Sequence, residues 1–461
     1  MRTIRQRAAV LAARGTARLL QLAGRGGTAL PGLLAERLAP ELVAEQARRL
    51  GRGVVLVTGT NGKTTTATLL AGALRAGGLR PLHNAEGANL MRGLAAAIAA
   101  AASWKGTLAG GRRAIGVFEV DEAVAPLAAR CCQPRVVVFT NLFRDQLDRY
   151  AELDTVAARW QELAAAAGGA TLVVNADDPL VGALPPPPGG RVVRYGIADP
   201  AIATSEPGPA DSIWCPRCGA QLVFRTVWFA HLGDYACPRC SYQRPPLEVA
   251  AVAVQPQGWH GTALRVAHGE REQEFFLPLP GVYNVANALG ALAAALALGV
   301  PLAVACRALS RATPAFGRGE RVTLAGRNVV VLLVKNPAGF TQALRTVMAA
   351  ERCPALLLAL NDRIADGRDV SWIWDADFEQ LAGRAGALTV SGDRAAELAL
   401  RLKYAGVAQP VTIVPDPARA LDRALAQGTG TLYVLPTYTA LLELHTRIAR
   451  RAGRARFWER Q

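Results

Sequence analysis

The sequence predicts an α/β fold, with a first domain built on a doubly wound and mostly parallel sheet and a second α/β domain after it. From Gly53 onward, short apolar runs alternate with stretches of helical periodicity, and the same alternation returns after Val322. This pattern is typical of βαβ units, in which helices join parallel strands. The 461 residues are enough for two to three domains, and 51% apolar with 19% charged residues indicate a globular chain.

Each element of the first α/β domain has its own local signal. Val54–Val57 is a run of apolar residues typical of a buried strand, and a helix is expected over Thr64–Leu79. A β-rich piece ends near Leu277, and an alanine-rich helix is expected over 284–298. The carboxyl ends of the strands should carry the active groups, because ligands bind at that edge of such sheets. Three further strands are expected at 115–120, 135–140 and 171–175.

The chain divides into three expected segments. Residues 1–52 form a basic helical segment, residues 53–320 the first α/β domain, and residues 321–461 a second α/β domain. An insert at about residues 205–247 interrupts the first domain. In the second domain, strands are expected at 329–334, 355–359, 387–390, 411–414 and 431–435.

Composition bounds the class of protein. No apolar run reaches the roughly 18 to 20 residues that cross a bilayer, and no secretory signal is convincing, so we expect a cytoplasmic protein. The net charge of +16 comes almost entirely from arginine, since lysine occurs only at positions 63, 105, 335 and 403. This bias indicates compositional drift, and charge alone does not lead us to expect a nucleic-acid partner.

Residues 1–50 contain many arginines but no acidic residue before Glu36. Two interpretations are open. The segment can be a solvated basic helix packed on the main domain, or a face that rests on anionic lipid or on an anionic lipid-linked substrate. The second interpretation would place the protein peripherally at the inner face of the plasma membrane.

The strongest chemical signal lies directly after the first strand, where a glycine-containing loop leads into a helix. Its backbone N–H groups can cradle phosphate, Lys63 can neutralise the outer phosphates, and Thr64 or Thr65 can reach Mg²⁺. The alternative is a glycine turn without a ligand. The loop predicts an ATP site formed by Gly59, Thr60, Asn61, Gly62, Lys63, Thr64 and Thr65.

A second polar group closes a neighbouring strand, where Glu119, Asp121 and Glu122 follow one another closely. Carboxylates at this edge suit Mg²⁺, either as direct ligands or through water. Glu119 is the first choice as the ligand. An acidic surface turn is the alternative.

Four cysteines form two Cys-Pro-Arg-Cys pairs with 18 residues between them. Two such pairs place four thiolates tetrahedrally, which predicts a structural zinc ribbon without an open catalytic position. We expect four aromatic residues to pack its core: Trp214, Trp228, Phe229 and Tyr235. A ribbon that reads nucleic acid is the alternative. The predicted zinc ligands are Cys215, Cys218, Cys237 and Cys240.

Several short motifs occur in a fixed order along residues 53–340, and together they resemble the Mur ligase superfamily. They lie at 58–66, 140–142 with Asp145 and Asp148, 175–179, 281–284 with 287–288, and 316–320. Further stretches, together with the predicted ribbon, are similar to the MurT type, the ligase subunits of lipid II isoglutaminyl synthases. These stretches lie at 84–89, 141–150, 335–340, 365–375 and 437–440.

The resemblance implies a reaction. Mur-type ligases phosphorylate a substrate carboxylate with ATP, and a nitrogen nucleophile then displaces phosphate from the acyl phosphate. For the MurT type, the carboxylate is the α-carboxyl of D-glutamate in the lipid II stem peptide, and the product is D-isoglutamine. Ammonia comes from a partner glutaminase of the GatD type.

The resemblance also implies roles for single residues. Lys63 and Thr64 bind phosphate and Mg²⁺, Glu119 binds Mg²⁺, and Asn284 with Arg318 lines the nucleotide pocket. Such chemistry needs cations and backbone dipoles around the phosphoryl group, not a covalent nucleophile.

An acidic stretch at 362–377 includes the residue that, by the resemblance, completes the Cys–His pair of the partner glutaminase. A carboxylate there would orient the imidazole. Asp369 is the first choice and Asp366 the second, and the alternative is that these are solvated loop acids or helix caps.

The sequence allows other functions as well. A Mur-type or folate-type ligase that adds an amino acid is the main alternative. Many such relatives carry a histidine at the position of Gln146 and another at Lys335, so the amine site here can differ. A nucleic-acid-binding ATPase and a non-catalytic scaffold are further alternatives.

Overall fold

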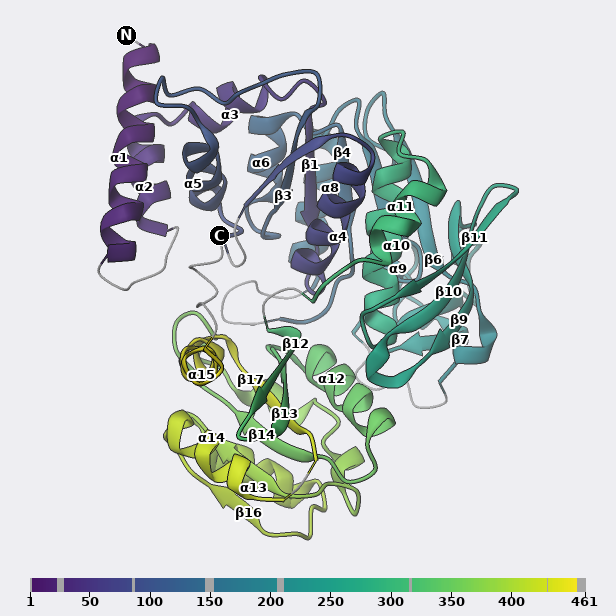
Figure 1. Ribbon diagram of the computed structural model, residues 1–461. Coiled ribbons are helices and arrows are strands. Elements are labelled where there is room, and N and C mark those ends of the chain that lie inside the picture. Colours follow the sequence, from purple (N-terminus) through teal and green to yellow (C-terminus); the bar gives the residue numbers. More distant parts are fainter. Residues whose placement is uncertain are drawn as a thin grey trace.

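The computed structural model describes residues 2–22, 29–84, 88–145, 153–204, 211–314, 317–428 and 430–453. Their strands gather mainly in two sheets, each covered by helices, and the smaller sheet lies below the larger one in Figure 1. The expected α/β class with mostly parallel sheets is confirmed.

Within the described ranges, nine strands form the larger sheet. Neighbours are parallel from the β2 edge as far as β9, and the last three strands are antiparallel. The strand order is β2 (Arg80–His83), β3 (Ala114–Glu119), β1 (Val54–Thr58), β4 (Val136–Phe139), β5 (Thr171–Asn175), β6 (Arg191–Ile197), β9 (Val249–Pro256), β10 (Thr262–His268) and β11 (Arg271–Leu277).

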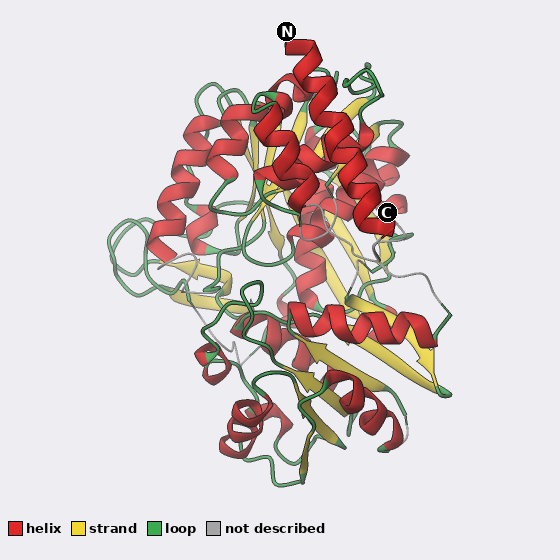
Figure 2. Ribbon diagram, turned by 90° about the vertical axis from the view of Figure 1, so that its left-hand side faces the viewer, coloured by secondary structure: helices red, strands yellow, loops and turns green. Residues whose placement is uncertain are grey.

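Helices cover both faces of this sheet, because its central strands are apolar on both sides. Val55 and Val57 pack in the cluster that holds α4 (Lys63–Ala76), α10 (Val282–Ala297) and α11 (Leu302–Leu309). Val54 and Leu56 pack in the cluster on the other face. The helices there are α1 (Arg2–Leu22), α2 (Ala29–Leu38), α3 (Leu42–Ala47), α5 (Met91–Ala101), α6 (Ala125–Cys132) and α8 (Leu153–Ala166). Figure 2 shows helices on both sides of the larger sheet.

The smaller sheet is again mostly parallel. Its order is β12 (Arg318–Leu324), β13 (Arg327–Leu332), β17 (Leu432–Pro436), β14 (Ala355–Ala359), β15 (Leu388–Ser391) and β16 (Val411–Ile413), with only the first pair antiparallel. One face packs on α12 (Pro337–Ala350) and α13 (Ala395–Tyr404). The other packs on α14 (Pro417–Ala426) and α15 (Tyr438–Arg451).

Short elements complete the described chain. A hairpin of β7 (Val223–Phe229) and β8 (Leu232–Ala236) follows the first cysteine pair, and α9 (Pro179–Gly182) is a single turn. Four 3₁₀ helices lie at Pro200–Ile202, Gly258–His260, Ser371–Trp374 and Glu379–Leu381.

The predicted elements agree with the observed ones to within a few residues. The strand expected at 171–175 is β5 itself, and the helix expected over 64–79 is α4 at Lys63–Ala76. β12 begins at Arg318, so residues 318–320 pair with the second sheet, while the boundary expected at 320 stays a prediction. Gln146, Asp148 and Phe316 lie outside the described residues. None of the described helices is long and apolar enough to cross a bilayer.

Candidate active site

The glycine-containing loop joins the carboxyl end of β1 to the N-terminus of α4. Gly59 and Gly62 have φ of 133° and 86°, a region that L side chains rarely adopt, and Gly62 caps α4. Thr60 Oγ1 donates to Phe143 O at 3.1 Å, and Asn61 N donates to Asn141 Oδ1 at 2.9 Å. The loop is therefore fixed by the segment that follows β4, with its backbone curled as a phosphate site requires.

The lysine of the loop is buried and folds back on it. Lys63 Nζ donates to the carbonyls of Gly59 and Thr60 and lies 3.2 Å from Glu122 Oε1. Burial acts to lower the pKa of Lys63, but the carboxylates around it, Glu122 foremost, outweigh burial and raise that pKa. Lys63 is therefore a fixed positive charge at the helix N-terminus, suited to an anion.

The predicted magnesium ligands lie side by side. Thr64 Oγ1 donates to Glu119 Oε2 at 2.7 Å. The end of β3 is fixed by Asn84, whose side chain accepts from Glu119 N at 2.9 Å and donates to Glu119 O at 2.9 Å. A hydroxyl and a carboxylate beside a phosphate loop are the oxygen donors that Mg²⁺ prefers, so the residues fit the ion.

Glu122 contacts Lys63, which the sequence did not predict. It belongs to the same acidic run as Glu119, but its carboxylate faces Lys63 and not Thr64. Burial raises the pKa of Glu122 although Lys63 acts in the opposite direction. The sequence offered no signal for this pairing, because all three acids follow one strand.

A cavity opens beside the loop. Asn284 and Arg318, which the family resemblance assigned to a nucleotide pocket, both lie in its wall. Burial raises the pKa of Tyr283 to about 12, against the effect of nearby Arg318. The wall combines the loop, the start of α10 and the second sheet: Asn61, Gly62, Thr65, Asn141, Phe143, Phe229, Tyr283, Asn284, Asn287, Gly317, Arg318, Leu332, Leu333, Ala338, Gly339, Gln342 and Ala343.

Side chains of both sheets meet at this site. Asn61 and Asn336 exchange hydrogen bonds of 3.3 and 3.0 Å through their amides, and Lys335 Nζ donates to the carboxylate of Asp145. Asn336 also caps α12, because its Oδ1 accepts from Gly339 N at 2.8 Å. The sequence did not indicate that these residues link the two halves of the chain.

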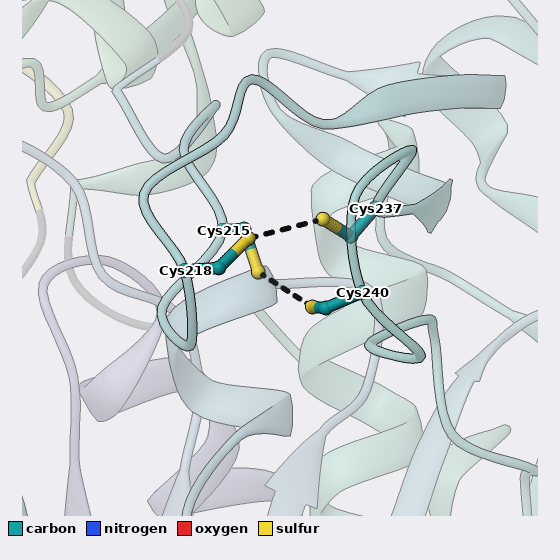
Figure 3. A group of neighbouring side chains, drawn as sticks. All are labelled: Cys215, Cys218, Cys237 and Cys240. Carbon is teal, nitrogen blue, oxygen red and sulfur yellow. Dashed lines mark hydrogen bonds between the residues drawn. The ribbon is translucent and has the colours of Figure 1, made fainter.

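The four cysteines lie together at the base of the hairpin. Their sulfurs are all within 4.8 Å of one another, with Cys215 and Cys240 at 3.6 Å and Cys218 and Cys237 at 3.5 Å (Figure 3). A tetrahedral ion with Zn–S bonds of about 2.3 Å places sulfurs about 3.8 Å apart, so the cluster fits Zn²⁺.

The prediction that four aromatic residues form the ribbon core is partly wrong. Tyr235 packs with Leu222 and Tyr242 beside the cysteines. Trp228 and Phe229 instead pack in the core of the main sheet, and Trp214 is exposed. The ribbon has its own small core, while the far end of its hairpin belongs to the main domain.

The tip of this hairpin reaches the active site. His231 is buried, and its Nε2 lies 3.3 Å from Asp178 Oδ2, which also accepts from Leu142 N at 2.7 Å. Arg144 Nε lies 2.6 Å from Asp211 Oδ1 in the segment before the cysteines, and its Nη2 lies 3.3 Å from Asp375 Oδ2. The insert therefore supports the 142–145 segment beside the phosphate loop.

The two aspartates considered for the partner's triad lie between β14 and β15, and their surroundings differ. Asp366 is buried and accepts from Thr439 N at 2.8 Å and from the Thr439 hydroxyl. Asp369 is half-buried and accepts from Ser371 N at 2.8 Å. Asp366 fastens the start of α15, whereas Asp369 leaves part of its carboxylate accessible.

Two family models match the chain. The Mur ligase middle domain matches residues 57–208 and the MurT ligase C-terminal domain matches residues 333–441. The phosphate loop, the acidic strand end and the adjoining cavity lie together in this fold. The chain is a Mur-type, ATP-dependent ligase.

Two similar proteins span nearly the whole chain. The subunit MurT of lipid II isoglutaminyl synthase (glutamine-hydrolyzing) from Staphylococcus aureus (strain COL) is 31% identical over 441 residues, covering 95% of this chain and 96% of its own. The protein of the same name from Streptococcus pneumoniae is 33% identical over 451 residues, covering 96% of each chain. The chain belongs to the MurT family.

Solved structures show the same fold at lower identity. A pseudomurein peptide ligase type C from Methanothermus fervidus has a TM-score of 0.65 and 22% identity, covering 86% of this chain and 78% of its own. A folylpolyglutamate synthase from Mycobacterium tuberculosis has a TM-score of 0.58 and 15% identity, covering 90% and 96%.

Proposed function

We propose that this chain is the ligase subunit of a lipid II isoglutaminyl synthase. It amidates the α-carboxyl of D-glutamate in the lipid II stem peptide to D-isoglutamine, through an acyl phosphate and with ammonia from a GatD-type glutaminase. The observation that carries the proposal is the full-length similarity to two MurT subunits of that name.

The chain's own residues suit the first half of this reaction. Lys63 and the N–H groups at the start of α4 hold the phosphates of ATP, and Asn284 with Arg318 borders the rest of the nucleotide. Thr64 and Glu119 would hold Mg²⁺, which would offset the charge on the transferring phosphoryl group. The substrate carboxylate attacks the γ-phosphorus, ADP leaves, and ammonia then displaces phosphate from the acyl carbon.

The second half of the reaction, in which the amide forms, needs a nitrogen source from outside the chain. Asp369 completes the Cys–His pair of the partner glutaminase, because its half-exposed carboxylate can accept an imidazole N–H. Zn²⁺ at the four cysteines has a structural role. The protein works in the cytoplasm, at the membrane face where a lipid-linked substrate is presented.

Reconstitution tests the proposal. The chain, copurified with a candidate GatD-type glutaminase, is incubated with lipid II, ATP, Mg²⁺ and either glutamine or ammonium, and the stem peptide is examined by mass spectrometry. We expect amidation in both mixtures, and hydroxylamine should trap the acyl phosphate as a hydroxamate. Amidation that proceeds without ATP would refute the mechanism.

A ligase that adds an amino acid is the second candidate, and the fold shared with a folylpolyglutamate synthase favours it. The same assay separates the two functions when free amino acids replace ammonium. Transfer of an amino acid to the stem peptide or to a folate, with no amide formed from ammonium, would establish the second candidate.

A further inference from the structure

α1 carries an apolar stripe on the side that faces away from the domain. Its exposed apolar residues recur every three or four positions, which places them on one side of a helix. Leu22, Ile4, Leu19 and Leu11 are 86%, 74%, 68% and 48% exposed. The outward stripe consists of Ile4, Ala8, Leu11, Gly15, Leu19 and Leu22.

A separate stripe of the same helix binds α1 to the domain. Ala9, Val10 and Ala13 are buried in the core cluster under the large sheet, and Gln6 accepts from Gln46 Nε2 at 3.1 Å. In Figure 1, α1 stands at the outer edge of the larger domain beside α2. The outward stripe is therefore not needed for packing on this chain.

Cationic and aromatic side chains border the outward stripe. On the helical wheel, Arg5 lies on one side and Arg7 with Arg18 on the other, and all three are exposed. The Arg7 guanidinium lies 5.0 Å from the ring centre of Trp104, which is 61% exposed, and Lys105 Nζ lies 5.6 Å from the same ring. The sequence of α1 contains no acidic residue.

The apolar stripe of α1 and the arginines beside it favour one kind of binding partner. A second copy of the chain would set arginines against arginines across a symmetric interface, which is unfavourable. An anionic bilayer accepts leucine and tryptophan at its headgroup boundary while its phosphates attract arginine. We propose that α1 lies flat on an anionic phospholipid bilayer, with its outward stripe in the headgroup region and Trp104 beside it.

The inference deepens the membrane-face location given above and rests on that part of the proposed function. The purified full-length chain is sedimented with vesicles of phosphatidylglycerol and phosphatidylcholine, or of phosphatidylcholine alone, without substrates. We expect binding to the anionic vesicles, weakened as salt screens the arginines. The double substitution Leu11→Gln/Leu19→Gln should lower the partition coefficient about tenfold, because less apolar surface enters the bilayer.

Leu400→Gln is the matched control, because Leu400 in α13 is 47% exposed against 48% for Leu11. It should leave vesicle binding unchanged, and Arg7→Gln/Arg18→Gln should weaken it. Circular dichroism checks that each variant is folded. Equal binding to both kinds of vesicle, or full binding by the Leu11/Leu19 variant, would overturn the proposal.

Two further measurements distinguish failure of the proposed membrane surface from failure of the proposed function. Amidation of a water-soluble stem peptide, measured for every variant, should not change. Intact amidation without vesicle binding would refute the docking surface alone, whereas loss of amidation in the unaltered complex would refute the proposed function. Sedimentation velocity should give no self-association that depends on Leu11 and Leu19, and such self-association would make a second copy the occupant.

Discussion

Lys63 Nζ lies 3.2 Å from Glu122 Oε1, and both side chains are buried beside the phosphate loop. The lysine expected to meet the nucleotide is therefore also held by a carboxylate of its own chain. Glu122 keeps the cation buried and in place, while Glu119 remains with Thr64. The acidic run at the end of β3 thus makes two separate contacts, Glu122 with Lys63 and Glu119 with Thr64, and the proposed mechanism assigns only the second to a metal ion.

Lys63→Ala should reduce ATP-dependent amidation by at least about 100-fold, because one preorganised charge at the phosphoryl group is lost. Amidation by the complex with the partner measures this, and copurification should show that the complex persists. Lys403→Ala is the control, since Lys403 is an exposed lysine on α13. If Lys63→Ala retained full amidation activity, Lys63 would not be the residue that stabilises the phosphoryl group.

The pKa of Lys63 also leads to an expectation about pH. The carboxylates raise it above the ordinary value of 10.5, although burial acts against them. A raised lysine pKa gives stability that is complete below the unfolded pKa and is lost as pH rises through the folded one. Urea unfolding of the unaltered protein should therefore show no loss of stability from Lys63 until the pH rises above the ordinary lysine value of 10.5.

Gly62→Ala tests the shape of the loop. A Cβ at Gly62 would lie 1.9 Å from Asn287 Oδ1, and the φ of 86° already disfavours alanine. We expect this variant to lose ATP binding, measured by calorimetry. Gly78→Ala is the control, because Gly78 has a similar φ of 81° but meets nothing within 4 Å. It should cost about 1 to 2 kcal/mol of stability and leave ATP binding intact.

Local patterns in the sequence predicted much of this site. The run Val54–Val57 and the glycines after it sufficed to place a strand, a loop and α4 in order. The cysteine spacing predicted a cluster that the fold brings together. The proximity of Thr64 and Glu119 followed from the rule that parallel strand ends share an edge.

Other contacts depend on how distant segments fold together. Asn61 and Asn336 are 275 residues apart, and only the placement of one sheet against the other brings their amides into contact. Trp228 and Phe229 were assigned to the ribbon, but the hairpin is long enough to insert its far end into the main core. Side-chain type alone does not distinguish those two positions.

Zinc removal should affect the active site as well as the ribbon. We expect one zinc per chain by mass spectrometry of the metal, and Cys237→Ser should lose it, since three thiolates hold the ion less well than four. The melting temperature should fall by at least about 5 °C. The KM for ATP should rise, because His231 and Phe229 at the hairpin tip support the site.

Cys353→Ser is the matched control for zinc. Cys353 is an exposed free cysteine far in sequence from the two pairs, so its replacement should leave zinc content, melting temperature and KM unchanged. Zinc retained by Cys237→Ser at full occupancy would contradict the four-cysteine site.

Asp369→Asn should separate the two sources of nitrogen. If its carboxylate orients the partner's histidine, the glutamine-dependent reaction should fall by about 1,000-fold or more, as in other nucleophilic triads that lose their acid. Amidation driven by added ammonium should be unchanged, because Asp369 lies on the segment after β14 and outside the cavity wall beside the loop. The ratio of the two rates measures the effect independently of protein concentration.

Asp366→Asn is the variant to compare with Asp369→Asn. Both carboxylate oxygens of Asp366 accept hydrogen bonds from Thr439. Replacing a buried hydrogen-bonded carboxylate should cost about 1 to 3 kcal/mol of stability. The glutamine-driven and ammonium-driven rates should then fall together, since a loosened α15 does not distinguish between nitrogen sources. A selective loss of the glutamine reaction in Asp366→Asn, with Asp369→Asn unaffected, would assign the triad position to Asp366. The partner would then have to displace Thr439 to reach that carboxylate.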